Sequence, residues 1–313
     1  MAFLSGLNVR EQCAKYRVSL WACPQFLFIV MGAVTIIAIV STATLAEKYA
    51  GDPMVTVGGA TIVAVIFLII GHTVVLSFDR LAAAGRSQAE FVSVISHQLR
   101  TPLSAVRWQL DVMAERLKKG NTDVGSVLGT VQDENNRVIK LVSALLEVNR
   151  IEEKRMGLHM ERVALWDLVS KTVEYYRTFA GALRLEIRLE RAEEQAYWVN
   201  ADEGKLRWII ENLIDNAIRY SDKGGRITIR VSHEKKYVKF SIEDQGIGIP
   251  KENQKQLFKK FYRAPNAQQV QTEGSGLGLF IVKSFVEIMG GSMHFQSEEG
   301  VGTTFWYFLP AAE

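Results

Sequence analysis

The apolar positions of this chain fall into three regions with different patterns. Two long runs without a charged residue come first, at residues 25–46 and 53–78, and the second contains His72. About 20 apolar residues are enough to cross the hydrocarbon core of a bilayer. The runs therefore predict two transmembrane helices within residues 25–78, with residues 1–24 as an N-terminal segment and 79–90 as a helical linker.

Two other interpretations of the runs are weaker. Paired core helices of a soluble protein would carry a polar face, which both runs lack. A cleaved signal peptide would have a shorter apolar segment that starts nearer the N-terminus. Membrane-spanning helices therefore explain the pattern best.

The charges beside the runs predict an orientation. Basic residues lie at their outer ends: Arg10, Lys15, Arg17, Arg80 and Arg86. The positive-inside rule then predicts a multi-pass protein of the inner (plasma) membrane, with both termini, and therefore all of residues 79–313, in the cytoplasm. The external turn at 47–53 is too short to form a ligand-binding domain. The partners that this part of the chain can contact are therefore membrane lipid and a membrane protein.

The second region shows helical periodicity. Apolar residues recur every three or four positions from Val92 to Leu117 and again from Val131 to Ile151, as in two amphipathic helices. His97 lies off the apolar stripe, so its imidazole is expected to be accessible and can act as a neutral nucleophile near pH 7. A two-helix hairpin buries little surface alone, so residues 91–155 are predicted to pair with a second copy in a four-helix bundle, giving a homodimer.

Composition excludes some classes of protein. The chain has 313 residues, enough for two domains or a domain with a membrane anchor, and a formal net charge of +3. That charge is too small to indicate a nucleic-acid partner. Cys13 and Cys23 are the only cysteines, which is too few for a disulfide framework, and we interpret both as reduced or without a specific role.

In the third region, from residue 156 onward, predicted helices and strands alternate. We expect helices at 166–179, 203–221 and from the glycine cluster to about 289, with strands at 184–190, 226–232 and 237–243. The helix at 203–221 carries polar residues at spacings of three and four, which gathers them on one face as the wall of a ligand site: Asn212, Asn216, Arg219 and Tyr220.

Two glycine clusters are candidate phosphate-binding turns. The first is the segment Asp244 to Pro250, directly after a strand, and the second is Gly274 to Leu279, which opens a helix. Neither is a P-loop or a dinucleotide fingerprint. A glycine loop before a helix N-terminus nevertheless suits phosphate, because backbone amides converge there and the helix dipole favours anions. The polar stretch 251–274 between them is predicted to form a lid.

These motifs together resemble the membrane-bound sensor histidine kinases of two-component systems. The chain is similar to that family in its histidine box (93–106), N box (208–221), first glycine box (244–250), F box (258–263) and second glycine box (274–279). The resemblance covers about residues 86–313. It implies an α+β multidomain fold, in which two transmembrane helices precede a dimerising helical hairpin and an α/β sandwich of the Bergerat type at 156–313 that binds ATP.

The resemblance implies a role for each site residue. Asn216 would hold Mg²⁺ between the phosphates, with Asn212 supporting it, and Asp244 would accept a hydrogen bond from the adenine amino group. Arg219 would reach a phosphate, and Tyr220 would line the nucleotide pocket. The remaining cofactor-binding residues would let the main chain approach the base (Gly246 and Gly248), offer backbone amides to phosphate (Gly276, Leu277 and Gly278) or complete the site (Thr303). Arg263 would stabilise charge on the transferred phosphoryl group.

The implied reaction is autophosphorylation of His97 from Mg-ATP, followed by transfer to an aspartate in the receiver domain of a separate response regulator. Related ATPases place a glutamate base where this chain has Asn212, which favours transfer over hydrolysis. The family usually has Glu or Asp after the phospho-acceptor, whereas Gln98 cannot act as a general base. Thr101, associated with phosphatase activity towards the regulator, is retained. The alternative is a catalytically weak membrane scaffold whose ATP domain acts only as a conformational switch.

Overall fold

The computed structural model describes residues 24–50, 53–118, 125–153, 156–192, 197–222, 224–271 and 274–312. The chain divides into two compact units between Ser96 and His97. Cys13, Cys23 and the basic residues before the first apolar run lie outside the described residues.

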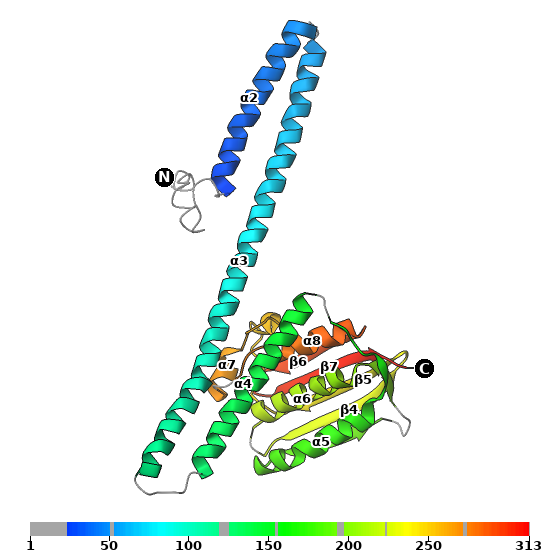
Figure 1. Cartoon of the computed structure of the whole chain (residues 1–313). Coiled ribbons are helices and arrows are strands. Elements are labelled where there is room, and N and C mark those ends of the chain that lie inside the picture. The colour runs from blue at the N-terminus through cyan, green and yellow to red at the C-terminus, as the bar shows by residue number, and fades with distance from the viewer. Residues whose placement is uncertain are drawn as a thin grey trace. The chain divides into compact units, whose positions relative to one another are not determined.

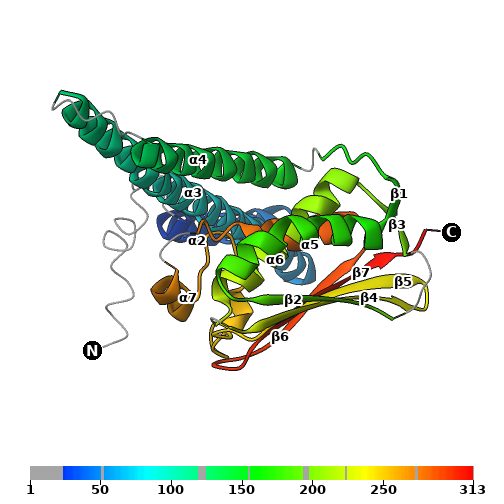
Figure 2. The same cartoon turned by 90° about the horizontal axis from the view of Figure 1, so that it is seen from below.

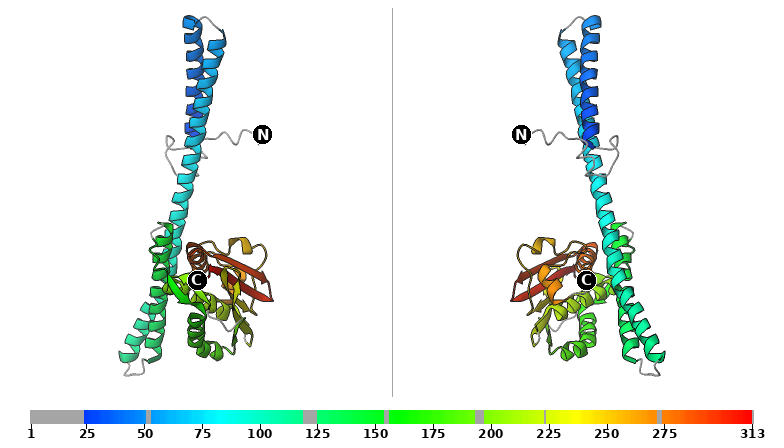
Figure 3. Two further views of the ribbon diagram at one scale, coloured as in Figure 1. Left: turned by 90° about the vertical axis from the view of Figure 1, so that its right-hand side faces the viewer. Right: turned by 90° about the vertical axis from the view of Figure 1, so that its left-hand side faces the viewer.

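The first unit is formed by α2 (Pro24–Ala50) and the beginning of α3 (Pro53–Lys118). The two helices run side by side in both views of Figure 3, and the Met31 methyl group lies 3.3 Å from where a Cβ on Gly71 would be. The segments Ile29–Tyr49 and Val57–Val74 each have a mean hydropathy of 2.2, and by length and composition each could cross a membrane. Helix α3 continues unbroken for 66 residues, so the prediction that residues 79–90 are helical is confirmed.

A helical hairpin begins the second unit. It consists of α3 from His97 onward and α4 (Gly125–Glu152). Leu141, Ala144 and Val148 of α4 are buried, whereas other large apolar side chains of the hairpin are exposed: Leu103, Trp108, Leu110, Leu117, Leu128, Ile139 and Leu146. A single hairpin thus leaves apolar surface uncovered, which fits the predicted pairing with a second copy.

An α/β sandwich follows the hairpin. Its mixed sheet has the order β2-β4-β5-β7-β6, with β2 and β4 parallel and the other neighbours antiparallel. The strands are β2 (Glu186–Arg191), β4 (Arg226–Glu234), β5 (Tyr237–Asp244), β6 (Ser292–Glu298) and β7 (Gly302–Pro310). Helices α5 (Leu165–Ala182), α6 (Glu203–Tyr220) and α8 (Gly278–Ile288) cover one face of the sheet (Figure 2). A two-stranded ribbon of β1 (Glu161–Ala164) and β3 (Trp198–Ala201) adjoins the end of β7 (Figures 1 and 2), where Val199 forms an isolated bridge with Ala311.

The core of the sandwich follows from two periodicities. Alternate residues of the central strands face the helices and are buried: Ile227, Ile229, Val231, Val238, Phe240, Ile242, Phe305, Tyr307 and Leu309. They meet the apolar faces of α6 and α8, where Trp208 and Phe285 pack edge to face with ring centroids 5.5 Å apart. The Asp202 carboxylate caps α6 by accepting the Lys205 N–H at 3.0 Å. This packing fixes the helix that carries the predicted polar wall.

The structure corrects several predicted elements. The sequence pattern did not predict β1, β3, β6 or β7. Strand β2 begins at Glu186 and not at residue 184, because Arg184 has a φ of 60° in the turn after α5. The polar stretch 251–274, for which no helix was predicted, contains the short helices η3 (Gln254–Gln256) and α7 (Pro265–Val270).

Candidate active site

One cavity of about 640 Å³ brings together residues from the hairpin and the sandwich. Its lining includes Asn212, Asn216 and Asp244 from the sandwich, and His97 and Gln98 from α3. Its volume is in the range of small-molecule sites. The structure thus places the predicted phospho-acceptor and the predicted nucleotide residues of one chain around a common space.

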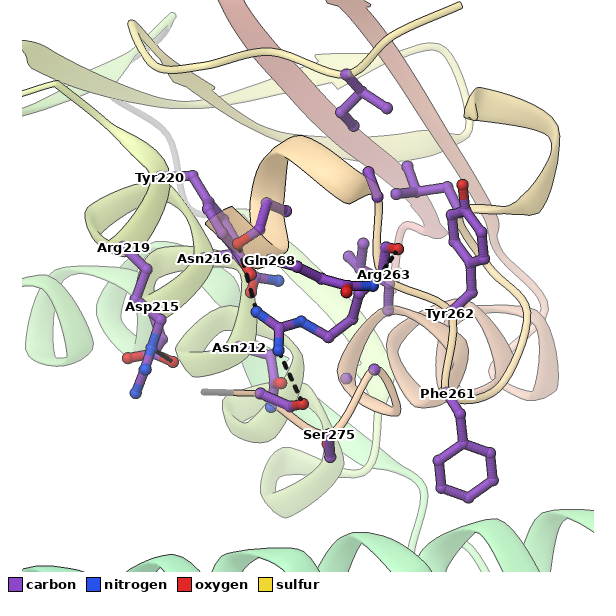
Figure 4. A pocket seen from close by; sticks show the side chains of 18 of the residues that line it. Asn212, Asp215, Asn216, Arg219, Tyr220, Phe261, Tyr262, Arg263, Gln268 and Ser275 are labelled. Carbon is purple, nitrogen blue, oxygen red and sulfur yellow. Dashed lines mark hydrogen bonds and ion pairs between the residues drawn. The ribbon is translucent and has the colours of Figure 1, made fainter. Parts of the chain in front are cut away.

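Helix α6 supplies one wall of this cavity. Asn212, Asn216 and Tyr220 follow one another at four-residue spacing, and Figure 4 shows their side chains on the side of the cavity. The Asn212 amide donates to the Trp208 carbonyl at 3.2 Å. Its oxygen lies 2.6 Å from where a Cβ on Gly278 would be. A side chain at residue 278 would therefore have to displace the Asn212 amide from the cavity wall.

Arg219 also lines the cavity, but its guanidinium has a carboxylate partner. Its Nε donates to Oδ2 of Asp215 at 2.6 Å, one turn back along α6. In Figure 4 the pair lies beside α6, away from Asn212 and Asn216. To reach a phosphate as predicted, Arg219 would have to leave or share this carboxylate.

Asp244 is a buried carboxylate at the end of β5, with 8% of its surface exposed. It accepts the Thr303 N–H at 3.2 Å. Burial raises the pKa of Asp244 from 3.8 to about 7, outweighing the backbone hydrogen bonds from Thr303 and Gly246, which lower it. A carboxylate poised near neutrality in a cavity is typical of a functional group.

The first glycine turn follows Asp244 directly. Gly248 lines the cavity with a φ of 60°, and a Cβ there would collide with the Glu298 carbonyl oxygen. Gly246 is buried against the Tyr220 carbonyl and is not among the residues that line the cavity. The turn therefore presents main chain to any ligand that reaches Asp244.

The second glycine loop leads into the N-terminus of α8. Gly274, Ser275, Gly276 and Gly278 line the cavity, whereas the Leu277 side chain is fully buried in the core. The Leu277 N–H donates to the Ser275 hydroxyl at 3.3 Å. The first amides of a helix have no partner within it, so this loop and the 11-residue α8 offer donors and a favourable dipole to an anion.

Arg263 and Asn266 tie the segment around α7 together. The Arg263 guanidinium donates to the carbonyls of Ala267, Gln271 and Gly274. The Asn266 amide donates to the Gly248 carbonyl at 3.0 Å. The predicted lid thus touches both glycine clusters through hydrogen bonds.

Thr303 lies on β7 behind Asp244. Besides its backbone bond to Asp244, its hydroxyl shares a 2.8 Å hydrogen bond with the Ser297 hydroxyl. Thr303 is buried but still contributes to the cavity lining. Its clearest effect is to hold the Asp244 carboxylate in place.

His97 is exposed on α3, as its place off the apolar stripe predicts. The Gln98 amide donates to the Ser275 carbonyl at the long distance of 3.5 Å, which links the histidine box to the second glycine loop. The Thr101 hydroxyl donates to the His97 carbonyl at 3.3 Å, so it is bonded within its own helix.

Two ion pairs join α4 to the sandwich. Lys205 Nζ lies 2.8 Å from Oε1 of Glu147, and both side chains are largely buried, with 22% and 16% exposed. Lys260 pairs with Glu152 near the end of α4. These pairs, with Gln98, hold the cavity between hairpin and sandwich.

Two family descriptions match separate parts of the chain. "His Kinase A (phospho-acceptor) domain" matches residues 87–154, which contain His97 and the hairpin. "Histidine kinase-, DNA gyrase B-, and HSP90-like ATPase" matches residues 201–313, which contain α6, both glycine clusters and Thr303. The chain belongs to the histidine kinase family.

Individual histidine kinases resemble the chain over the same region. Sensor histidine kinase WalK of Bacillus subtilis is 32% identical over 230 residues, which is 73% of this chain and 37% of WalK. Sensor protein SrrB of Staphylococcus aureus is 32% identical over 224 residues, 72% of this chain and 38% of SrrB. The chain thus spans under two fifths of the length of these curated relatives.

Solved histidine kinases have the same fold. Full-length ShkA in complex with AMPPNP is 27% identical with a TM-score of 0.53, covering 71% of this chain and 46% of ShkA. AdeS of Acinetobacter baumannii gives 22% identity and a TM-score of 0.55, covering 69% and 98%. ThkA in complex with response regulator protein TrrA gives 21% and 0.55, covering 75% and 64%. The last two likenesses show the fold alone.

Sequence reasoning missed two basic residues in the cavity of this histidine kinase. Arg137 and Lys140 line it from α4. Their spacing of three residues places them on one side of a helix. This spacing indicates a site only when the hairpin is known to lie against the predicted nucleotide residues, and no local sequence motif predicts that packing.

Proposed function

We propose that this chain is an ATP-dependent protein-histidine kinase that autophosphorylates His97. One observation carries the proposal: an exposed histidine lines the same cavity as the asparagine wall, the buried carboxylate and the glycine loops. A ring nitrogen of His97 would attack the terminal phosphorus of ATP. A nitrogen–phosphorus bond forms, the bond from phosphorus to the bridging oxygen breaks, ADP leaves, and the ring proton is released.

The residues around the cavity suit the two ends of ATP. The ionised Asp244 carboxylate would accept a hydrogen bond from the adenine amino group, with the Gly248 main chain against the base. The amides that open α8 and the Asn212 and Asn216 side chains would face the phosphates. When Mg²⁺ is bound, its charge neutralises the phosphates, and the Asn216 amide oxygen is the ligand we assign to it. The described residues contain no acidic cluster that would hold a metal without the nucleotide.

Gln98 sets this chain apart from the family pattern that its sequence resembles. Its amide can orient through the Ser275 carbonyl, but it cannot take a proton from His97. General-base help is worth about 10²- to 10⁴-fold in rate. We therefore expect slow autophosphorylation, with the ring proton passing to water. The neutral Gln98 is also the feature that favours the scaffold alternative.

The partner of the phosphorylated chain would be the receiver domain of a separate response regulator, whose aspartate takes the phosphoryl group. The solved complex of ThkA with response regulator protein TrrA supports this for a protein of the same fold. Thr101 would serve a phosphatase reaction on the same regulator. The helical hairpin with its uncovered apolar side chains supports a homodimer.

The two apolar helices support a place in the inner membrane. Both termini and the sandwich would lie in the cytoplasm, as the flanking basic residues indicate. The stimulus would then reach α3 from lipid or from a membrane protein partner, through the unbroken helix that carries His97.

The test is label transfer from γ-labelled ATP to the full chain in membrane vesicles with Mg²⁺. We expect acid-labile label on the wild-type chain and none on His97→Ala. The matched control is His159→Ala, because His159 is also exposed but does not line the cavity. Equal labelling of His97→Ala would refute the assignment of the acceptor, and ATP binding without label on any variant would favour the scaffold.

A further inference from the structure

Four basic side chains line the cavity that holds His97: Arg137, Lys140, Arg219 and Arg263. Only two carboxylates, Asp215 and Asp244, are among the lining residues. The cavity therefore favours an anion, as a site for transferring a phosphoryl group must.

Three of these basic residues already have partners. Arg219 is bound to Asp215, and Arg137 lies 3.6 Å from Glu134 on its own helix. Arg263 donates to main-chain carbonyls around α7. Lys140 is different: within the part of the chain that the structure describes, no ion pair or hydrogen bond involves its ammonium group.

Lys140 comes from the same hairpin as the acceptor. It lies on α4, next to the buried Leu141, while His97 and Thr101 line the cavity from the facing helix. Its side chain is exposed, and a lysine stem with four carbons lets the ammonium turn towards a group that arrives in the cavity.

We propose that Lys140 is a catalytic residue that contacts the phosphoryl group during its transfer to His97. The proposal rests on the function proposed above. As the bond to His97 forms and the bond to ADP breaks, negative charge is carried by the three outer oxygens of the phosphoryl group. The Lys140 ammonium hydrogen-bonds to one of them in the transition state and in the phosphohistidine, and it gives up no proton.

Lys140 would act on a different phosphate group from the residues that bind the nucleotide. Asn216 and the α8 amides contact phosphates that stay on the nucleotide. Lys140, placed on the acceptor's own domain, contacts the phosphoryl group that leaves. Loss of its charge should therefore slow the chemical step without weakening ATP binding.

The test uses the full chain in lipid nanodiscs with Lys140→Gln, Lys140→Arg and, as a matched control, Lys171→Gln. Lys171 is an exposed lysine on α5 that does not line the cavity. The readouts are the maximal rate of His97 labelling, the KM for ATP, and the lifetime of the phosphohistidine. We expect Lys140→Gln to lower the maximal rate by about 10- to 100-fold, less than the roughly 10²- to 10³-fold loss for a water-excluded transition-state donor because Lys140 is exposed, with the KM for ATP within about twofold.

Rescue separates a chemical role from a structural one. Lys140→Arg should restore most of the rate because it keeps the charge, and Lys171→Gln should match wild type. A wild-type rate for Lys140→Gln would overturn the proposal, as would a loss confined to transfer onto a receiver domain. Failure of Lys140→Arg to rescue would also overturn it. If the wild-type chain takes no label at all, the proposed kinase function fails first.

Discussion

Replacing Asp244 with asparagine should make the sandwich more stable at alkaline pH while it weakens ATP binding. Asp244 is 8% exposed and its pKa is raised from 3.8 to about 7 by burial. Above pH 7 the folded chain must hold a charge in a poorly hydrated place. Asparagine has nearly the same shape and no charge, so the variant avoids that cost.

The size of the effect follows from linkage. One pH unit corresponds to about 1.4 kcal/mol for each proton, so a pKa that rises from 3.8 to about 7 costs the ionised fold on the order of 4 kcal/mol. Between these two pKa values the folded chain binds more protons than the unfolded chain. This group therefore lowers the free energy of unfolding as pH rises through that window. After allowing for a weaker hydrogen bond to the main chain, we expect a gain of about 2 to 4 kcal/mol for Asp244→Asn at pH 8.

The assay is urea unfolding of residues 156–313, which contain their own core, followed by tryptophan fluorescence at pH 5 and pH 8. The matched control is Glu243→Gln, the adjacent carboxylate on the opposite face of β5. Its side chain is 46% exposed and its Oε2 lies 3.1 Å from the Arg230 guanidinium, so we expect a change below about 1 kcal/mol. A stability gain for Asp244→Asn that is equal at the two pH values would refute the reasoning, and so would no gain at pH 8.

The same variant tests the contact to adenine. In the wild type, ATP affinity should fall as pH drops below about 7, by up to about tenfold per pH unit, because the protonated carboxyl no longer offers its full acceptor strength. Asp244→Asn should bind ATP weakly at both pH values, as measured by calorimetry. A pH dependence that survives in the variant would show that another group controls binding.

Three further predictions concern the loops and the acceptor. Gly278→Ala places a methyl group 2.6 Å from the Asn212 amide oxygen, so either Asn212 or α8 must move. We expect the affinity for ATP, measured by calorimetry, to fall about tenfold or more. An unchanged affinity would show that the site accommodates the methyl group. Gln98→Glu supplies a base beside His97 and should raise the autophosphorylation rate by about 10- to 100-fold; an equal or lower rate would show that proton removal is not limiting. Because one chain supplies both His97 and the nucleotide residues of the cavity, mixed dimers of His97→Ala and Asn216→Ala chains should take no label, and label on the Asn216→Ala chain would show transfer between protomers.

The sequence was most informative where periodicity and glycine motifs agree. The α6 wall, both glycine clusters, the hairpin and the continuous α3 all follow from patterns that extend over several turns or lie beside a strand. The edge strand β6 was missed because Ser292–Glu298 alternates too weakly in polarity. Strand β7 was missed because its aromatic residues occupy both faces, where Tyr307 is buried while Trp306 faces the other side.

Site chemistry was less predictable than the positions of the site residues. The family resemblance implied that Arg219 and Arg263 act on the phosphates, but it could not show that Asp215 and the main-chain carbonyls around α7 already bind them. Nor could it show that Lys140 lines the same cavity as His97, because that depends on how two distant segments pack. Pairings between segments are set by tertiary structure, and a single sequence records them only indirectly.

The make-up of the nucleotide pocket restricts how this chain could become resistant to an inhibitor. Its floor is main chain at Gly248, where any side chain meets the Glu298 carbonyl, together with the Asp244 carboxylate. Few substitutions could prevent the binding of a compound that contacts only this main chain and Asp244, because each of them would also weaken binding of the nucleotide. Compounds that extend to the exposed Gln268 side chain would instead contact a residue to which no role in nucleotide binding is assigned, so its substitution would cost the chain less. Durable inhibition should therefore come from compounds that contact only the Gly248 main chain and Asp244.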